Sequence, residues 1–440
     1  MQVSTEKKDG VKYVLTVTVP ADEVSKAYNL SLKNCAKNAK LDGFRKGHIP
    51  TKLLVENFSH RIEADALEFI ISNNLGKAVS ESKLDVVGYP TIDMAESSLK
   101  KDQDFTFKAI VEVTPELEIK PYADLKIKKV VSTITDADID SMIENLRKQQ
   151  GKWQVQDDAV VAKDTRISID FTGRTDGVEF EGGKAQNFDI IVGQTQMIPG
   201  FVEQIEGHKA GDKFTIQVKF PEEYHAENLK GKDAEFDIVV NAVSTLSLPE
   251  VNEDFVKVFG IKDGSVDTFK ADLRKNMQRE LDRALYVQNR SKLFDALVDQ
   301  YGEFEVPSAY VKSEQDRLKQ NFVNQMKAYG MKKVPTELLD NDEGFKDDAI
   351  KAARLGVIVR KIMVSENINK PNDSYVEAQL TQIAQAYEEP EEVKAQIRKN
   401  KSQFENVENA AMEAEFVDKL LSQACDGEES KGFSELVGRR

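Results

Sequence analysis

The chain has 440 residues, of which 40% are hydrophobic and 31% are charged, and its formal net charge at pH 7 is −15. This length exceeds what one hydrophobic core supports, so about two to four domains are expected. The acidic balance argues against a general nucleic-acid binder, and Cys35 and Cys425 are too few for a disulfide scaffold. The start lacks the apolar core of a signal peptide, and no apolar run approaches the roughly 18 residues of a membrane span.

The first 112 residues are predicted to form a compact α+β domain. Alternating apolar residues indicate strands, and apolar residues at helical spacing indicate two helices. A hairpin turn is expected at KKDG, residues 7–10, before the first of these strands. The strands are expected at 11–19, 84–94 and 105–113, and the helices at 24–39 and 50–79.

A basic loop follows the first predicted helix. Between Lys26 and Lys52 the only acidic residue is Asp42, and a stripe of lysines lies on the polar face of the helix. The helix leads into GFRKGHIP, residues 43–50, where Phe44 stands beside Arg45 and Lys46. The stretch is too rich in Gly and Pro for a helix or strand. It is either an ordinary solvated turn or a loop that displays an aromatic residue and two cations to a partner.

Residues 113–149 are predicted to be a linker of mostly extended character with a short helix from Thr135. Residues 150–246 have a different pattern, in which short strands are separated by glycine-containing turns such as TGRTDG and HKAG. This pattern indicates an antiparallel β domain.

Residues 247–425 are predicted to be all α-helical, and residues 426–440 to be a disordered tail. The predicted helices cover 266–299, 308–329, 336–367, 373–387 and 391–422. Their apolar residues are mostly core by default, but methionines and aromatic residues also suit a surface that accepts many apolar sequences. The expected fold class is multidomain α+β: an α+β domain, an antiparallel β domain and an all-α domain.

The middle domain reads IDFTGRTDGVEFEGG, then FDIIVGQTQMIPGF, then FPEEYHAENLKGKDAEFDIVV. This pattern resembles the FK506-binding type of peptidyl-prolyl isomerase. The resemblance implies an apolar catalytic pocket, with Phe201 in place of the tryptophan of smaller members and Phe188 shared with the core. The implied catalytic residues are Phe171, Phe180, Glu181, Met197, Ile198, Phe201, Tyr224 and Phe236. The alternative is that these aromatic residues only fill a small β core.

Other catalytic sites find little support in the sequence. The four histidines show no metal-ligand spacing, and the glycines of IEGHKAGDK do not match a phosphate loop. No nucleophilic triad is indicated. We therefore expect no metal and no cofactor.

The basic loop, the isomerase-like domain and the long helical region in this order resemble the trigger factor family of ribosome-associated bacterial chaperones. The resemblance implies that Phe44, Arg45 and Lys46 dock on the large ribosomal subunit near the polypeptide exit, where the two cations meet an acidic protein side chain or RNA phosphates. It also implies a cytoplasmic protein that binds nascent and unfolded chains, assists folding, protein export and cell division, and dimerises when free. Two alternatives are a free cytosolic prolyl isomerase and a non-enzymatic holdase.

Overall fold

The computed structural model describes residues 1–93, 99–224, 226–331, 335, 339, 343–385, 387 and 389–438. Met94 at the end of a predicted strand, His225, and most of the first residues of the helix predicted from 336 lie outside the described residues. The chain divides into two compact units, Met1–Val130 with Val287–Glu429, and Val131–Tyr286 with Ser430–Arg440. Each unit therefore combines segments that are distant in the sequence.

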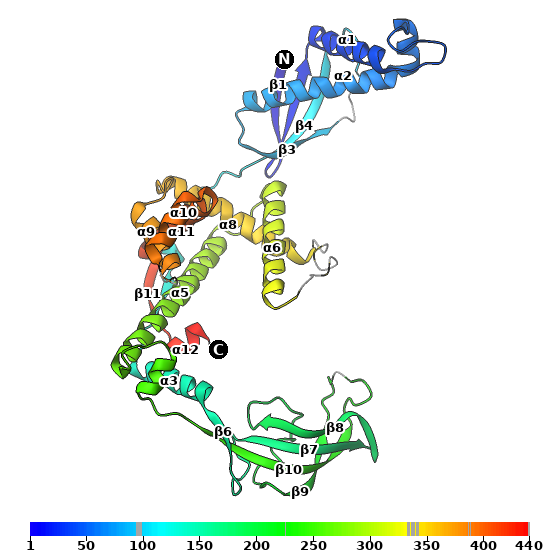
Figure 1. The fold of residues 1–440 in the computed structure, drawn as a ribbon. Helices are drawn as coiled ribbons and strands as arrows, with labels where there is room; N and C mark the ends of the chain where they lie inside the picture. Colours follow the sequence, from blue (N-terminus) through cyan, green and yellow to red (C-terminus); the bar gives the residue numbers. More distant parts are fainter. Residues whose placement is uncertain are drawn as a thin grey trace. The chain divides into compact units, whose positions relative to one another are not determined.

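The N-terminal part of the first unit is a four-stranded antiparallel sheet covered by two helices (Figure 1). The strand order is β1-β2-β4-β3, and the inward residues of β2 and β4, such as Leu15 and Phe107, are fully buried. Residues from both helices, including Val24 and Ile70, join the same core. The elements are β1 (Gln2–Asp9), β2 (Lys12–Val19), α1 (Ala21–Asn38), α2 (Thr51–Ser82), β3 (Val86–Asp93) and β4 (Phe105–Val113). The alternation and the helical period in the sequence predicted β2, β3, β4 and the two helices, whereas strand β1 and the strand order come from the structure.

The two helices are joined at residues 39–50 by the basic loop. The backbone of α2 is non-helical at Phe58, where the helix is kinked. Val24, Tyr28 and Cys35 of α1 are buried, whereas its lysines lie on the exposed face. The predicted lysine stripe is therefore confirmed as a solvent-facing feature of α1.

The remainder of the first unit is helical. Ring contacts such as Phe294 against Phe416, with centroids 6.3 Å apart, hold the C-terminal part of α5 against α11. The elements are α5 (Val266–Tyr301, which runs through both units), α6 (Ser308–Ala328), η2 (Glu343–Phe345), α8 (Lys346–Ser365), α9 (Asp373–Ala384), α10 (Pro390–Lys399) and α11 (Lys401–Ala424).

The single helix predicted over 391–422 is wrong, because the chain forms two helices there. The break is at Asn400, whose backbone leaves the helical region and whose side-chain oxygen accepts a hydrogen bond of 3.2 Å from the Gln403 backbone N–H. Such a side chain satisfies one of the unpaired N–H groups at a helix start. The local cap therefore separates α10 from α11.

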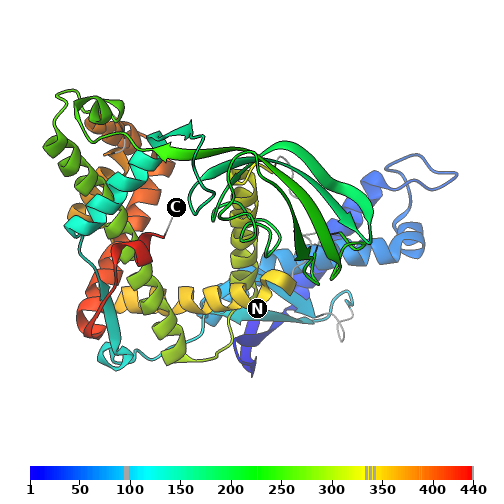
Figure 2. The ribbon, with the colours of Figure 1, turned by 90° about the horizontal axis from the view of Figure 1, so that it is seen from below.

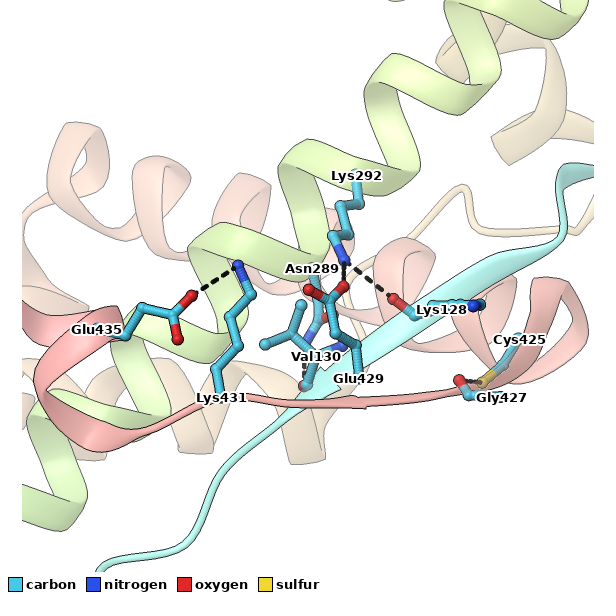
Figure 3. A network of polar contacts seen from close by, with 9 residues as sticks. All are labelled: Lys128, Val130, Asn289, Lys292, Cys425, Gly427, Glu429, Lys431 and Glu435. Atoms are coloured by element: carbon cyan, nitrogen blue, oxygen red, sulfur yellow. Dashed lines mark hydrogen bonds and ion pairs between the residues drawn. The ribbon is translucent and has the colours of Figure 1, made fainter.

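The predicted disorder of residues 426–440 is also wrong as far as Gly438. Residues Cys425–Ser430 form strand β11, which pairs with β5 (Ile127–Val131), and Phe433–Val437 form helix α12. Nearby, the buried Asn289 side chain donates to the Val130 carbonyl at 2.9 Å and accepts from the Val130 N–H at 2.7 Å (Figure 3). The Asn289 amide thus satisfies both backbone groups of Val130, and Lys292 forms an ion pair with Glu429. These contacts order a segment that looks polar and structureless in the sequence.

The second unit contains the predicted β domain. Its long strand β10 pairs with β7 on one side and with β9 and β6 on the other, and β8 pairs with β7. Figure 2 shows this sheet, in green, as strongly twisted. The strands are β6 (Lys152–Val155), β7 (Arg166–Thr175), β8 (Val178–Ile191), β9 (Lys213–Lys219) and β10 (Asp233–Ser247).

A separate helical core completes the second unit. It joins α3 (Asp136–Gln150), α4 (Glu253–Val258), the first half of α5 and α12. The predicted helix from Thr135 is α3, and Thr135 and Asp138 form a reciprocal capping box at its start. Phe433 of α12 is buried in the same core as Ile139 and Phe269. The short helix η1 (Tyr122–Leu125) precedes β5 in the chain, within the first unit.

Candidate functional site

The β domain holds a cavity of about 500 Å³ with an apolar, largely aromatic lining. All of the predicted catalytic residues except Glu181 line it. None of the described residues of the lining carries a charge. The lining residues are Phe171, Phe180, Gly182, Gln196, Met197, Ile198, Pro199, Phe201, Phe220, Pro221, Tyr224 and Phe236.

The floor of the cavity is built from rings on separate elements. Phe236 comes from the central strand β10, and Phe201 from the turn segment after β8; they are 3% and 1% exposed. Their centroids lie 5.2 Å apart at 84°, and Phe171 of β7 lies 6.0 Å from each. Edge-to-face pairs of this kind are each worth about 0.5–1.5 kcal/mol beyond burial. The rings therefore fix one another's orientation as well as fill the core.

The rim of the cavity comes from two turns. Gly200, at φ +84°, and a hydrogen bond of 3.0 Å from the Phe201 N–H to the Ile198 carbonyl turn the chain so that Met197 and Ile198 are half-buried at the cavity. On another side, the Tyr224 N–H donates to the Pro221 carbonyl at 3.2 Å, and the Tyr224 ring lies 4.8 Å from Phe220. These turns place the phenol group of Tyr224 at a cavity whose other lining residues are apolar except for Gln196.

The prediction did not name Phe220 and Pro221 as site residues. Phe220 is 2% exposed and contacts Phe180 edge-to-face at 5.7 Å. A signal for it was present, because Ile216, Val218 and Phe220 alternate along and just after β9 and are all buried. The residue at the end of that alternation reaches the cavity.

Glu181 and Phe188 do not take the places expected of them. Glu181 follows the lining residue Phe180 on β8 and is exposed, since successive residues of a strand face opposite sides. Phe188 is 39% exposed and lies outside the lining, although its ring meets Phe171 edge-to-face at 5.7 Å. Glu181 is therefore not a lining residue of the cavity, and Phe188 packs against the lining residue Phe171 without lining the cavity itself.

The polar groups of the domain lie on the outer face of the sheet. Asp237 of β10 accepts hydrogen bonds from the Thr215 hydroxyl at 2.7 Å and from Arg174 at 2.8 Å. The Thr215 hydroxyl, and after it Arg174, lower the pKa of Asp237 from its ordinary value. Because Phe236 and Asp237 alternate, the charged pair stays away from the cavity.

The predicted basic loop is fully displayed. In Figure 2 it extends beyond the ends of α1 and α2, the two blue helices. Arg45 and Lys46 are exposed, and the Phe44 side chain is 41% exposed. The flanking residues Ala39 and Ile49 are buried in a small core between the helices. The loop is thus anchored at its base and open at its tip.

Two turns shape the tip of this loop. The Phe44 N–H donates to the Leu41 carbonyl at 3.1 Å, and the His48 N–H donates to the Arg45 carbonyl at 2.9 Å. Gly43 and Gly47 have φ of +85° and +86°, a region that residues with a Cβ rarely adopt. The glycines therefore allow the backbone to present Phe44 between them.

The helical region of the first unit also offers a groove. A cavity of about 410 Å³ lies among α9, α10 and α11, with apolar residues and several carboxamides in its lining. Tyr387, which is 58% exposed, and Ile383, which is 41% exposed, belong to it. Tyr329 and Met331 are exposed elsewhere, after α6. Some of the predicted Met and aromatic residues therefore lie at the surface and others in the core.

Neither a metal site nor a membrane-spanning helix is found among the described residues. No group of His, Cys, Asp or Glu side chains within the ranges given above is arranged to hold a metal ion. No helix among those residues is both long and apolar enough to span a membrane.

The chain thus joins an uncharged, largely aromatic cavity in a twisted antiparallel sheet to a basic loop and a helical domain. A family model described as "FKBP-type peptidyl-prolyl cis-trans isomerase" matches residues 158–241. Models described as "Bacterial trigger factor protein (TF)" and its C-terminus match residues 1–146 and 265–422.

A curated relative, "Trigger factor" of Tolumonas auensis (strain DSM 9187 / NBRC 110442 / TA 4), is 39% identical over 439 residues, covering 100% of this chain and 99% of the relative. The chain therefore belongs to the trigger factor family, whose members are ribosome-associated chaperones with peptidyl-prolyl isomerase activity. A solved structure from work on "Promiscuous Substrate Recognition in Folding and Assembly Activities of the Trigger Factor Chaperone" aligns over 96% of this chain and 100% of that one, with a TM-score of 0.45 and 17% identity. At these values it adds nothing to the assignment.

Proposed function

We propose that the aromatic cavity is the active site for prolyl isomerisation. The observation that carries this proposal is the shape and composition of the cavity: rings on three strands and two turns enclose a space of about 500 Å³ without a charged side chain among its described lining. Phe220 and Pro221 join the catalytic set, and Glu181 leaves it. Phe171, Phe201 and Phe236 form the floor, whereas Tyr224 offers a hydroxyl to a substrate carbonyl.

The chemistry requires no nucleophile. Rotation about a peptide bond faces a barrier of about 18–20 kcal/mol because the C–N bond has partial double-bond character. Twisting the bond removes the conjugation and the charge separation that comes with it. A dry apolar site therefore binds the twisted amide better than the planar, strongly solvated one, and this difference lowers the barrier. Proline is the suitable substrate because its cis and trans forms differ by only about 0.5–1 kcal/mol.

We also propose that Phe44, Arg45 and Lys46 dock the chain on the large ribosomal subunit near the polypeptide exit. The exposed ring suits an apolar crevice, and the two cations suit acidic side chains or RNA phosphates. The lysines on the outer face of α1 extend the positive surface toward the loop. A cytoplasmic location follows from this role.

The helical region, residues 247–425, is proposed to hold nascent and unfolded polypeptides. Its groove among α9, α10 and α11 combines apolar side chains with carboxamides, which can form hydrogen bonds to a peptide backbone irrespective of sequence.

In the free protein, the exposed loop and groove are proposed to be covered by a second copy of the chain. Residues 1–112, 113–149 and 150–246 are proposed as the docking domain, the linker and the isomerase domain.

The docking proposal is tested by ribosome co-sedimentation of a Phe44→Ala, Arg45→Ala, Lys46→Ala variant. We expect loss of pelleting with unchanged kcat/KM on an X-Pro peptide, because the two sites lie in different units. Wild-type pelleting should also weaken steeply with salt if RNA phosphates contribute. Normal pelleting of the triple variant would refute the docking residues, whereas a wild-type chain that does not pellet would be a free isomerase or a holdase.

The domain proposal is tested with a fragment of residues 150–246. The cavity lining lies entirely within these residues, so we expect near full activity on a short peptide. On a protein whose refolding waits for proline isomerisation, the fragment should be at least about tenfold less efficient than the full chain, because the helical region raises the local concentration of prolines. Equal efficiency on that protein would contradict a holding role for residues 247–425.

A further inference from the structure

A polar cluster on the outer face of the isomerase sheet joins three strands at one point. Asp170, on β7, lies between Ile169, which is buried, and Phe171, which lines the cavity. Its carboxylate therefore points away from the cavity. One oxygen of this carboxylate accepts a hydrogen bond of 2.8 Å from the Asn187 backbone N–H and one of 2.7 Å from the Asn241 side-chain amide. No part of the proposed mechanism uses these residues.

The partners of Asp170 are the extra residues of two β-bulges. On β8, Ile169 pairs with Phe188 and Phe171 pairs with Ala185, so Asp170 faces two residues of that strand. On β10, Ile169 pairs with Val240 and Ser168 with Ala242, so Asn241 is the extra residue. A bulge re-aims the side chains that follow it and changes the register of the strand. Asp170 thus forms hydrogen bonds to the bulge residues of both neighbouring strands, Asn187 of β8 and Asn241 of β10.

The β8 bulge depends on an unusual backbone conformation. Asn187 has φ +49°, in the left-handed region, which asparagine tolerates better than most residues. Its side-chain oxygen also lies 3.3 Å from the Asn241 amide nitrogen. A carboxylate that accepts a backbone N–H makes a charge-assisted bond, which is stronger than a neutral one. The cluster therefore stabilises the conformation that creates the bulge.

The bulge decides which way Phe188 and Ile190 face. Ile190 is fully buried opposite Ile167, and the Phe188 ring stands at 90° to the Phe171 ring. A register shift of one residue would turn both side chains to the other face of the sheet. Phe171 would then lose the ring that supports it opposite Phe201 and Phe236.

We propose that Asp170 is a positioning residue for prolyl isomerisation: it holds the Asn187 and Asn241 bulges so that Phe188 keeps the cavity ring Phe171 in its productive orientation. The effect passes through the sheet, from a polar cluster on the outer face to the apolar cavity on the inner face. This inference rests on the proposed active site. Small displacements of groups that shape a site can cost one to two orders of magnitude in rate.

The test uses the full chain and an X-Pro peptide assay. We expect Asp170→Ala to lower kcat/KM about fivefold, and Asp170→Asn to stay within about twofold of wild type, because the amide oxygen still accepts the Asn187 N–H. Equal losses in the Ala and Asn variants, or wild-type activity of Asp170→Ala, would overturn the proposal. Phe201→Ala serves as the reference in the same assay, since wild-type activity there would refute the active site itself.

A double-mutant cycle separates positioning from general destabilisation. Phe188→Ala should lower kcat/KM about as much as Asp170→Ala. The kcat/KM of the double variant should lie within about twofold of that of the less active single variant. Losses that multiply would show that Asp170 does not act through Phe188, and would overturn the proposal.

A matched pair at Asn187 tests the bulge without touching Asp170, in case Asp170→Ala does not fold. Asn187 is exposed, so its side chain can be changed without opening the core. Asn187→Gly keeps the backbone N–H and adopts positive φ freely, so activity should remain within about twofold. Asn187→Val strains that conformation and should lower kcat/KM at least about fivefold. Equal activity of the Gly and Val variants would contradict the role of the bulge.

Discussion

Phe201 and Phe44 are the same residue type in opposite situations. The Phe201 side chain is 1% exposed and meets Phe171 and Phe236 edge-to-face, whereas Phe44 is 41% exposed in a loop whose glycines have nothing near their Cβ positions. The cavity is assembled from strands and turns spread over 66 residue positions, from 171 to 236. The loop needs only two turns and a buried base.

The difference separates two ways of presenting an apolar side chain. In the proposed active site, the rings hold each other, so a change at one ring should alter both stability and catalysis. In the proposed docking loop, the side chains are exposed, so a change should alter binding and leave the fold intact.

The largest effect is expected at Phe201. Phe201→Ala removes the most buried ring of the cavity, which should cost about 3–5 kcal/mol of stability and at least about tenfold in kcat/KM. Tyr224→Ala should give a similar loss of activity with a smaller loss of stability, because Tyr224 is only half-buried. Peptide kinetics and thermal unfolding of the two variants measure this. The prevention of aggregation should be retained, and a wild-type Tm for Phe201→Ala would contradict the packing argument.

A smaller effect on the cavity is expected from Gly173→Ala. A Cβ at Gly173 would lie 2.5 Å from an atom of the Phe236 ring, which is itself held by Phe201 and Phe180. Forcing the ring aside should cost about 1–3 kcal/mol and reduce isomerase activity. Ribosome binding should be unchanged, and the same two assays report both results. Full activity of Gly173→Ala would show that the Phe236 ring can move without consequence.

The matching changes in the loop should be milder. Ala at Gly43 or Gly47 would meet no atom within 4 Å, so only the positive φ opposes it. The exposed loop of the free protein can relax this strain, so Tm should change little, whereas restoring the binding conformation costs about 1 kcal/mol and should weaken ribosome binding several-fold. Affinity measured by co-sedimentation at several concentrations tests this. Unaltered affinity in a Gly43→Ala, Gly47→Ala double variant would mean that the loop adopts another conformation when bound.

The smallest effect concerns pH. The Thr215 hydroxyl and Arg174 lower the pKa of Asp237, so the folded form favours the carboxylate more than the unfolded form does. This contribution is present above the unfolded pKa of about 3.9 and is lost as the pH falls through the folded value. Asp237→Asn should therefore lower Tm slightly at pH 7 and by less at pH 3. The side chain is half exposed, so solvent screening keeps the effect small. An equal difference at both pH values would assign it to something other than the charge.

Much of this fold is visible in the sequence because it depends on local period. Val17 and Phe107 alternate with polar neighbours and are buried, and the cavity rings follow an ordered pattern along β7, β8 and β10. Phe220 was missed although its alternation with Val218 was present. Glu181 lies outside the cavity because it follows Phe180 on β8, and the alternation of the strand turns it to the outer face.

Other features are not encoded locally. Strand β11 has mostly exposed residues, and its order comes from pairing with β5 and from contacts near Asn289, more than 130 positions earlier. The two bulges at Asp170 depend likewise on strands that are distant in the sequence. Local patterns carry no information about which distant partner a polar segment will meet.

The position of Phe433 has a consequence for how the protein is made. The helical core of the second unit contains Ile139 and Phe269 together with Phe433, which follows nearly all of the other residues of the chain. Chains are synthesised from the N-terminus, and early segments begin to fold before later ones exist. Phe269 must therefore wait for α12 through the translation of about 160 further residues, and Ile139 through about 290, at roughly 5–20 residues per second. During that interval of many seconds, the nascent chain exposes an incomplete apolar core of the kind that chaperones cover.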